Sequence, residues 1–140
     1  MAWIKRLVVL LLLLAIGFLG WSWQMGPLRI KRDISQFAKN MESCTAFNQD
    51  FKDAFSGKTM HRAVTGPAAD DTCGVVMDTY APQVLSCAFA MEDMPNLAAA
   101  FATQAKNIGF FGRISMRVDT QNPDPWQRAM NSPACTLKDR

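Results

Sequence analysis

Histidine is almost absent from this sequence of 140 residues, in which His61 stands alone. A catalytic zinc site usually takes two or three imidazole ligands, and a single histidine cannot provide them. The sequence also lacks the Gly-x-Ser-x-Gly turn of a serine hydrolase and any Cys-x-x-Cys pair. We therefore expect His61 to be a surface residue of a non-enzymatic chain, with no metal and no cofactor.

Clustered positive charge is missing from most of the chain. The formal net charge is +3, but residues 34–140 hold ten basic and eleven acidic side chains. Nucleic-acid binding requires a basic stripe that replaces the counterions of the phosphates. The nearly neutral domain excludes strong nucleic-acid binding, because the excess charge belongs to five basic residues near the amino terminus: Lys5, Arg6, Arg29, Lys31 and Arg32.

Acidic and thioether side chains also lack a recognisable ligand pattern. Asp70 and Asp71 lie in a stretch with Gly66 and Pro67, without the alternating oxygen ligands of a calcium loop. Nine methionines are present, and thioethers bind Cu(I), but methionine in a small core usually fills gaps. We expect solvated loop carboxylates and packed methionines.

What the sequence does contain is a long apolar run over residues 7–23, interrupted by Ser22 alone. As a helix it would be roughly 26 Å long, close to the thickness of a bilayer's hydrocarbon core. Trp3, Trp21 and Trp23 lie where aromatic rings favour the two membrane interfaces. We predict a transmembrane signal-anchor in contact with lipid, preceded by a cytoplasmic n-region over residues 1–6. A cleaved signal peptide, and hence a secreted domain, is the alternative.

The four cysteines, Cys44, Cys73, Cys87 and Cys135, all follow the apolar run. An even number of well-spaced cysteines in a small exported domain predicts two disulfides, which require an oxidising compartment. We therefore expect residues 34–140 to lie in the periplasm or an equivalent space. The chain would cross the inner membrane once.

The connectivity of these cysteines is partly constrained by a predicted hairpin. If residues 74–79 pair with residues 84–91 through a turn over residues 80–83, then residue 79 faces residue 84. Cys73 and Cys87 would be about three positions out of register, on the order of 10 Å apart, which is too far for an unstrained bond. This favours pairings that connect Cys44 or Cys135 to the middle of the domain.

Two helices are predicted after the apolar run. Apolar residues recur every three or four positions over residues 34–55, which indicates one long amphipathic helix packed on the core. Gly57 would end this helix, and Asp33 would cap it at the end of a juxtamembrane joint over residues 24–33. The second helix would begin at its N-cap Asp93 and end at Gly109.

Strands are predicted over residues 58–65 as an edge strand, over residues 75–77, and over residues 84–91, where a helix is the alternative. Residues 66–71 would form a loop. Alternating apolar residues predict a further strand over residues 110–119, so residues 84–119 resemble a strand-helix-strand crossover, with an antiparallel arrangement as the alternative. A tail containing Trp126 would be held by Cys135. The predicted fold class is α+β, a small disulfide-stapled domain with a sheet of about three to five strands.

The function predicted from these features is a membrane-tethered interaction module without catalytic activity, an accessory or assembly subunit of an inner-membrane or envelope complex. It would bind a protein partner in the membrane or periplasm, and Arg113 and Arg117, on the solvated face of the strand over residues 110–119, are candidate contacts. One alternative is a periplasmic inhibitor or immunity-type protein that inserts the loop over residues 66–72. A further alternative is a small envelope hydrolase in which His61 meets Asp70, Asp71 or Asp78.

Overall fold

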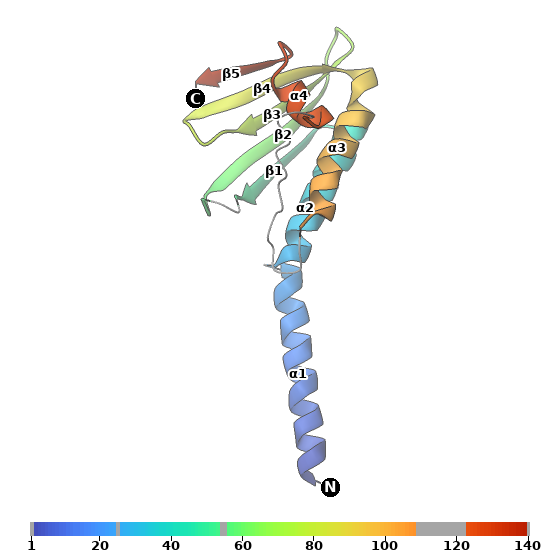
Figure 1. The fold of residues 1–140 in the computed structure, drawn as a ribbon, viewed down its shortest axis with the longest axis vertical. Coiled ribbons are helices and arrows are strands. Elements are labelled where there is room, and N and C mark those ends of the chain that lie inside the picture. Colours follow the sequence, from blue (N-terminus) through green and yellow to red (C-terminus); the bar gives the residue numbers. More distant parts are fainter. Residues whose placement is uncertain (1, 25, 54–55, 109–122, 140) are drawn as a thin grey trace.

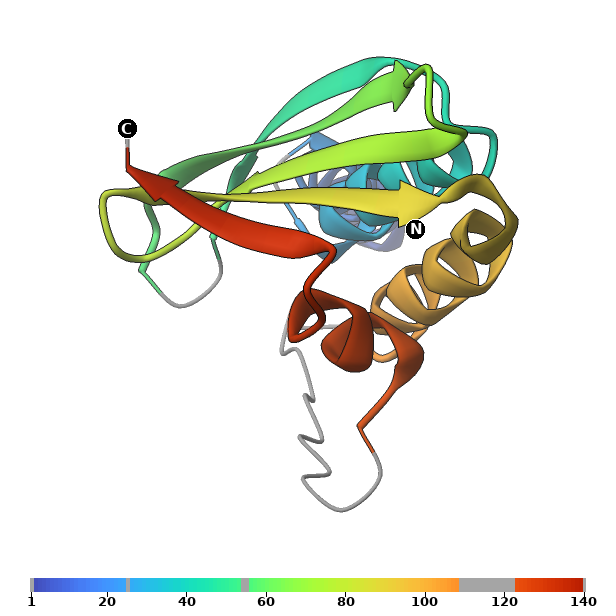
Figure 2. The same cartoon turned by 90° about the horizontal axis from the view of Figure 1, so that it is seen from above.

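A long helix and a two-layer domain make up the computed structural model, which describes residues 2–24, 26–53, 56–108 and 123–139. Helix α1 (Ala2–Gln24) projects from the domain (Figure 1). In the domain, helices α2 (Pro27–Glu42), α3 (Met94–Lys106) and α4 (Pro125–Met130) lie on one side of a sheet (Figure 2). A short 3-10 helix over Met91–Asp93 precedes α3. The architecture is therefore α+β, as predicted.

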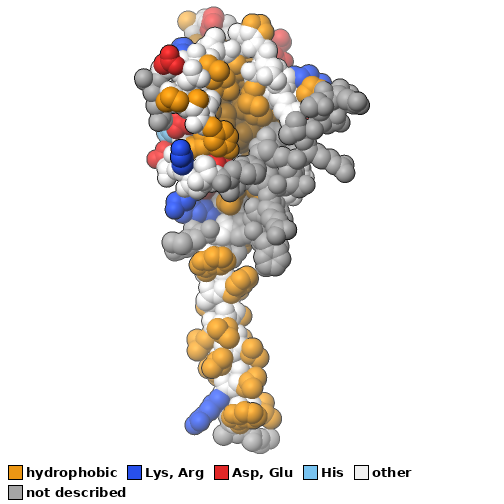
Figure 3. All heavy atoms as spheres, turned by 60° about the vertical axis from the view of Figure 1, so that its left-hand side comes forward, with side chains coloured by type: hydrophobic (Ala, Val, Ile, Leu, Met, Phe, Trp, Pro, Cys, Tyr) orange, Lys and Arg blue, Asp and Glu red, His pale blue; other side chains and the backbone are white. Residues whose placement is uncertain are grey.

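No residue of α1 whose burial is described belongs to the core. Within this helix, Trp3–Trp21 is long and apolar enough to cross a membrane, with a mean hydropathy of 2.1, and none of it is buried. Hydrophobic side chains accordingly cover the projecting helix (Figure 3). A surface of this kind is stable in lipid and not in water, so the helix has the character of a membrane anchor or a signal segment.

Helix α2 differs from the predicted helix at both ends. It begins at Pro27, where the fixed φ of proline suits the first helical turn, so residues 27–33 of the expected joint are helical. Asp33 therefore lies inside α2 and not at its cap, and its carboxylate is 3.6 Å from the guanidinium groups of Arg29 and Arg32. The helix ends at Glu42, because Cys44 adopts a positive φ of 48° that turns the chain.

The second half of the predicted helix over residues 34–55 is instead a strand, and that prediction was wrong. Strand β1 (Phe47–Lys52) has alternate half-buried and exposed residues. Phe47 and Phe51 are four positions apart, a spacing that fits one face of a helix and also one face of a strand. Exposure alternates from one residue to the next between them, which is the pattern of a strand.

The described strands form one antiparallel sheet in the order β1-β2-β3-β4-β5, with β2 at Thr59–Pro67, β3 at Thr72–Asp78, β4 at Gln83–Ala90 and β5 at Cys135–Asp139. β2 lies inside the sheet, so the prediction of an edge strand there was wrong. The hairpin of β3 and β4 is confirmed, although Asp78 and not Thr79 lies opposite Val84, and residues 83–90 are strand and not helix.

The predicted strand-helix-strand unit is only partly observed. Strand β4 and helix α3 follow each other as expected, although the Asp93 side chain makes no capping hydrogen bond. The predicted strand over residues 110–119 lies outside the described residues. On its far side β4 pairs with β5 in antiparallel orientation, and every strand pair in the described part of the chain is antiparallel.

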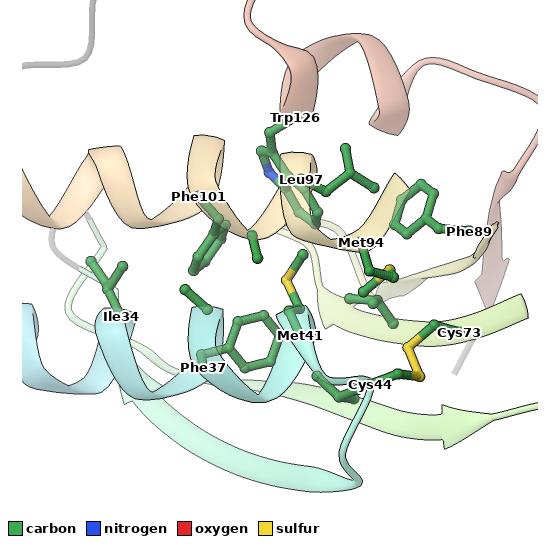
Figure 4. Packing of buried hydrophobic residues seen from close by; sticks show 14 of the residues in the cluster. Ile34, Phe37, Met41, Cys44, Cys73, Phe89, Met94, Leu97, Phe101 and Trp126 are labelled. Carbon is green, nitrogen blue, oxygen red and sulfur yellow. A yellow bond between two sulfur atoms is a disulfide. The ribbon is translucent and has the colours of Figure 1, made fainter. Parts of the chain in front are cut away.

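The core lies between the helices and the sheet (Figure 4). Trp126 from α4 is 3% exposed, and its ring centroid is 5.3 Å from that of Phe101 in α3 and 6.0 Å from that of Phe89 in β4. Phe37 from α2 contacts Phe101 at 5.3 Å. These aromatic contacts join the carboxyl-terminal segment to the rest of the domain, so the segment is not a free polar tail.

Two disulfides are present. Cys44–Cys73 joins the end of α2 to β3, and Cys87–Cys135 joins β4 to β5. This is the kind of pairing that the predicted hairpin favoured, since Cys73 lies opposite Phe89 and not opposite Cys87. Together with the apolar helix, the disulfides indicate a membrane or extracytoplasmic location.

Candidate interaction surface

The single histidine lies on the sheet face opposite the helices. The Nδ1 atom of His61 is 2.8 Å from the Asp50 Oδ1 atom on the neighbouring strand. The Asp78 carboxylate accepts a hydrogen bond of 2.8 Å from the backbone N–H of His61 and not from its ring. Because the Asp50 side chain is 72% exposed, this pair is a solvated cross-strand contact.

Asp70 and Asp71 lie in the turn between β2 and β3, at the other end of the sheet from the turn that follows Asp78. The Thr72 hydroxyl donates a 2.7 Å hydrogen bond to the Asp70 carboxylate and holds its pKa below the usual value. Asp71 has a positive φ of 57°, and its carbonyl accepts a hydrogen bond from Met91 N–H. Both residues therefore stabilise the turn. In the described part of the chain, neither of them contacts His61.

Tyr80 and Asp53 meet at the opposite end of the sheet, where two hairpin turns lie side by side. The Tyr80 hydroxyl donates a 3.0 Å hydrogen bond to Asp53 Oδ1, and partial burial together with this carboxylate raises the pKa of Tyr80. A shallow pocket between the turns is lined by residues 56, 58–60 and 78–83. Among the described residues no three His, Cys, Asp or Glu side chains are grouped as metal ligands.

Arg62 is the one charged side chain among the buried residues described, at 4% exposure, and the sequence patterns did not single it out. Its Nε and Nη2 atoms both donate to the Gln49 Oε1 atom, at 2.8 and 2.6 Å. The guanidinium carbon also lies 4.6–5.4 Å from the ring centroids of Phe37, Phe51 and Phe101. Desolvation lowers the pKa of Arg62 to about 10, and the charge of Asp33 opposes this shift.

Arg62 begins a row of side chains that crosses the helix-side face of the sheet. Its cross-strand partner is Met77 in β3, followed by Leu85 in β4 and Leu137 in β5. We call Met77, Leu85 and Leu137 the apolar row. Met77 and Leu85 are half-buried, but Leu137 is 59% exposed. The helices therefore leave the β5 end of this face open, and hydrophobic side chains gather in a hollow of the domain (Figure 3).

The exposed end of the apolar row is the strongest candidate for an interaction surface in the described residues. A large aliphatic side chain at the edge of a sheet, continuous with half-buried neighbours, is a feature of surfaces that bind other proteins. No sequence pattern marks this surface, because residues 135–139 read as part of a polar tail and not as a strand. The earlier candidates Arg113 and Arg117 lie outside the described residues.

Comparison with known proteins found no matching family model, no similar curated protein and no similar solved structure.

Proposed function

We propose that this chain is a membrane-tethered, non-enzymatic interaction module, an accessory or assembly subunit of an inner-membrane or envelope complex, with its domain in the periplasm. The observation that carries the proposal is the state of α1: its described side chains from Trp3 to Trp21 are all exposed. A helix that gives nothing to the core of its own domain serves another environment, and its composition suits lipid.

Tethering has a physical consequence for binding. A domain fixed to a bilayer meets other membrane proteins at a high effective concentration, so a modest contact surface is sufficient for a stable complex. The β5 end of the apolar row supplies such a surface, since Leu137 is exposed while Leu85 and Met77 beside it are half-buried. The disulfides support maturation outside the reducing cytoplasm.

The two alternatives gain no specific support from the geometry. Gly66, Pro67 and Thr72 of the loop predicted over residues 66–72 belong to β2 and β3, which leaves a four-residue turn at residues 68–71, short for insertion into an enzyme cleft. A hydrolase built on His61 would use Asp50 as the ring's partner, and both groups face solvent.

The experiment is purification of the full chain from native membranes in mild detergent. We expect a membrane protein at fixed stoichiometry with the chain, and mass spectrometry of the isolated chain should find α1 retained. Leu137→Asp should reduce recovery of the partner at least tenfold, whereas Thr136→Asp, an exposed neighbour on the other sheet face, should not. Recovery of a lone monomer in several detergents would contradict the proposal.

A further inference from the structure

Among the described strands, β5 lies at one edge of the sheet, and the directions of its backbone groups follow from its pairing with β4. The Ala88 N–H donates to the Ala134 carbonyl at 2.9 Å, so Ala88 and Ala134 occupy a hydrogen-bonded position of the ladder. In an antiparallel ladder such pairs alternate with pairs whose N–H and C=O groups point away from each other. Thr136 and Lys138 therefore bond to β4, while the N–H and C=O of Leu137 point outward from the edge.

The strand is held in place at both ends. The Cys87–Cys135 disulfide fixes its first residue to β4, and the Gln83 side-chain amide donates a 3.0 Å hydrogen bond to the Asp139 carboxylate at its last described residue. Such an edge is already ordered before any partner arrives. Binding to it therefore costs little conformational entropy on this side of the interface.

The other edge of the sheet, β1, has the opposite character. The Asp53 N–H donates to the Lys58 carbonyl. With the same alternation, the outward-facing backbone groups of β1 belong to Asn48, Asp50 and Lys52. Polar and charged residues at these positions are the usual protection of an edge strand against pairing. On β5 the corresponding residue is Leu137, which is apolar and 59% exposed.

We propose that β5 binds an extended segment of a partner protein by strand addition, so that the segment becomes a sixth strand beside β5. This inference rests on the proposed function as an interaction module and names its mode of contact. We take the segment to add in antiparallel orientation, as in every described strand pair of the sheet. The partner residue directly opposite Leu137 would then accept and donate backbone hydrogen bonds there, and its side chain would lie on the helix-side face. It would contact Leu137 at the open end of the apolar row. The segment is therefore apolar at this position.

The test begins with a benzoylphenylalanine cross-linker in place of Leu137 in the full chain in native membranes. Mass spectrometry then identifies the cross-linked segment, which is synthesised as a peptide. A matched peptide carries an N-methyl group on the residue opposite Leu137, which removes its backbone donor and leaves its side chains unchanged. Both peptides are titrated against the full chain in detergent.

Two variants of Leu137 separate the contribution of its backbone N–H to binding from that of its side chain. Leu137→Ala keeps the outward N–H and should weaken peptide binding about tenfold, while Leu137→Pro also removes the N–H and should weaken it at least a hundredfold. Formation of the Cys87–Cys135 bond reports that each variant folds. If Leu137→Pro fails to fold, the N-methylated peptide decides on the unchanged chain: it should bind at least tenfold more weakly than its parent.

Equal binding of the two peptides would overturn strand addition, as would equal affinities of the Ala and Pro variants. Cross-links only to lipid, only to a second copy of this chain, or to nothing would also overturn it. If a stoichiometric partner co-purifies equally with the Leu137→Pro chain and with the unchanged chain, strand addition is refuted. The proposed function as an interaction module is then retained. No partner with either chain refutes both.

Discussion

Cys87 and Cys135 lie directly opposite each other in β4 and β5, with their Cα atoms 4.0 Å apart. This short separation is typical of antiparallel residue pairs that do not exchange backbone hydrogen bonds. The bond is therefore placed where the strands approach most closely, and it closes the chain over a sequence separation of 48 residues.

We predict that removing this disulfide with Cys87→Ala and Cys135→Ala lowers the free energy of unfolding by roughly 4 kcal/mol, the chain-entropy value for a loop of this length. Strand β5 should become more accessible, because it would then be held to β4 by backbone pairing and by side-chain hydrogen bonds such as that from Gln83 to Asp139, without a covalent bond. Denaturant unfolding and amide exchange at Thr136 and Lys138 measure the two effects. The matched pair Cys44→Ala and Cys73→Ala should lower stability by a similar amount without increasing exchange in β5.

Burial of the charged Arg62 side chain should be tolerated because Gln49 accepts its hydrogen bonds. Gln49→Leu leaves the guanidinium without its described hydrogen-bond acceptor and should cost roughly 2 kcal/mol of unfolding free energy. Adding Arg62→Met removes the charge that needs the acceptor, and stability should return to within about 1 kcal/mol of the unchanged chain. Urea denaturation measures both. Gln36→Leu, at an exposed position on α2, is the control and should change stability by less than about 0.5 kcal/mol. A double variant less stable than Gln49→Leu would contradict this account.

Gly74 should be intolerant of a side chain because of Thr65. A Cβ atom at Gly74 would collide with the Thr65 Oγ1 atom on the neighbouring strand. We expect Gly74→Ala to lower the unfolding free energy by about 1–3 kcal/mol, and Thr65→Ala in the same chain to restore most of it. A double-mutant cycle of thermal or urea unfolding measures the coupling, and additive effects would show that the two residues do not interfere.

The Asp70 carboxylate should titrate below the usual pH range, since the Thr72 hydroxyl stabilises its charged form. A lowered folded-state pKa contributes stability that is present above the unfolded-state pKa and is lost as the pH falls through the folded-state value. Thr72→Val removes the hydroxyl, so the pKa should rise toward that of an ordinary aspartate. NMR titration of the Asp70 carboxyl carbon in both chains is the measurement, and an unchanged pKa would exclude the hydrogen bond as its cause.

The domain should fold without α1. A chain that begins at Gly26 keeps every described residue of the core cluster, which starts at Ile34 with Ile30 packed against it. We expect it to be soluble without detergent and to melt within a few degrees of the full chain in detergent, as measured by circular dichroism. A chain that begins at Ser35 lacks Ile34 and half of α2, and it should not fold. Aggregation of the longer truncation would mean that α1 supports the domain.

The sequence predicted the features that depend on a single strong pattern. The apolar run predicted α1, and the predicted hairpin argued against a bond between Cys73 and Cys87. The spacing of Phe47 and Phe51 led to the wrong prediction of a helix, because residues four apart share a face in both a helix and a strand. No local pattern marks the turn at Cys44. Nothing in the chain around Arg62 reveals burial, because its acceptor Gln49 and its three aromatic neighbours come from other elements. The open edge at Leu137 likewise exists only once β5 has paired with β4.

The short connection between α1 and α2 limits where this domain can work. Helix α1 ends at Gln24 and α2 begins at Pro27, so the two intervening residues span at most about 10 Å of chain. Helix α2 has 16 residues and is therefore about 24 Å long. If α1 lies in a bilayer, the short connection keeps the domain from moving away from the membrane. Its strands then stay within a few nanometres of the lipid surface. A protein that docks here must carry its own docking segment to that height, which restricts the candidates to membrane-bound neighbours and to soluble proteins that approach the bilayer closely.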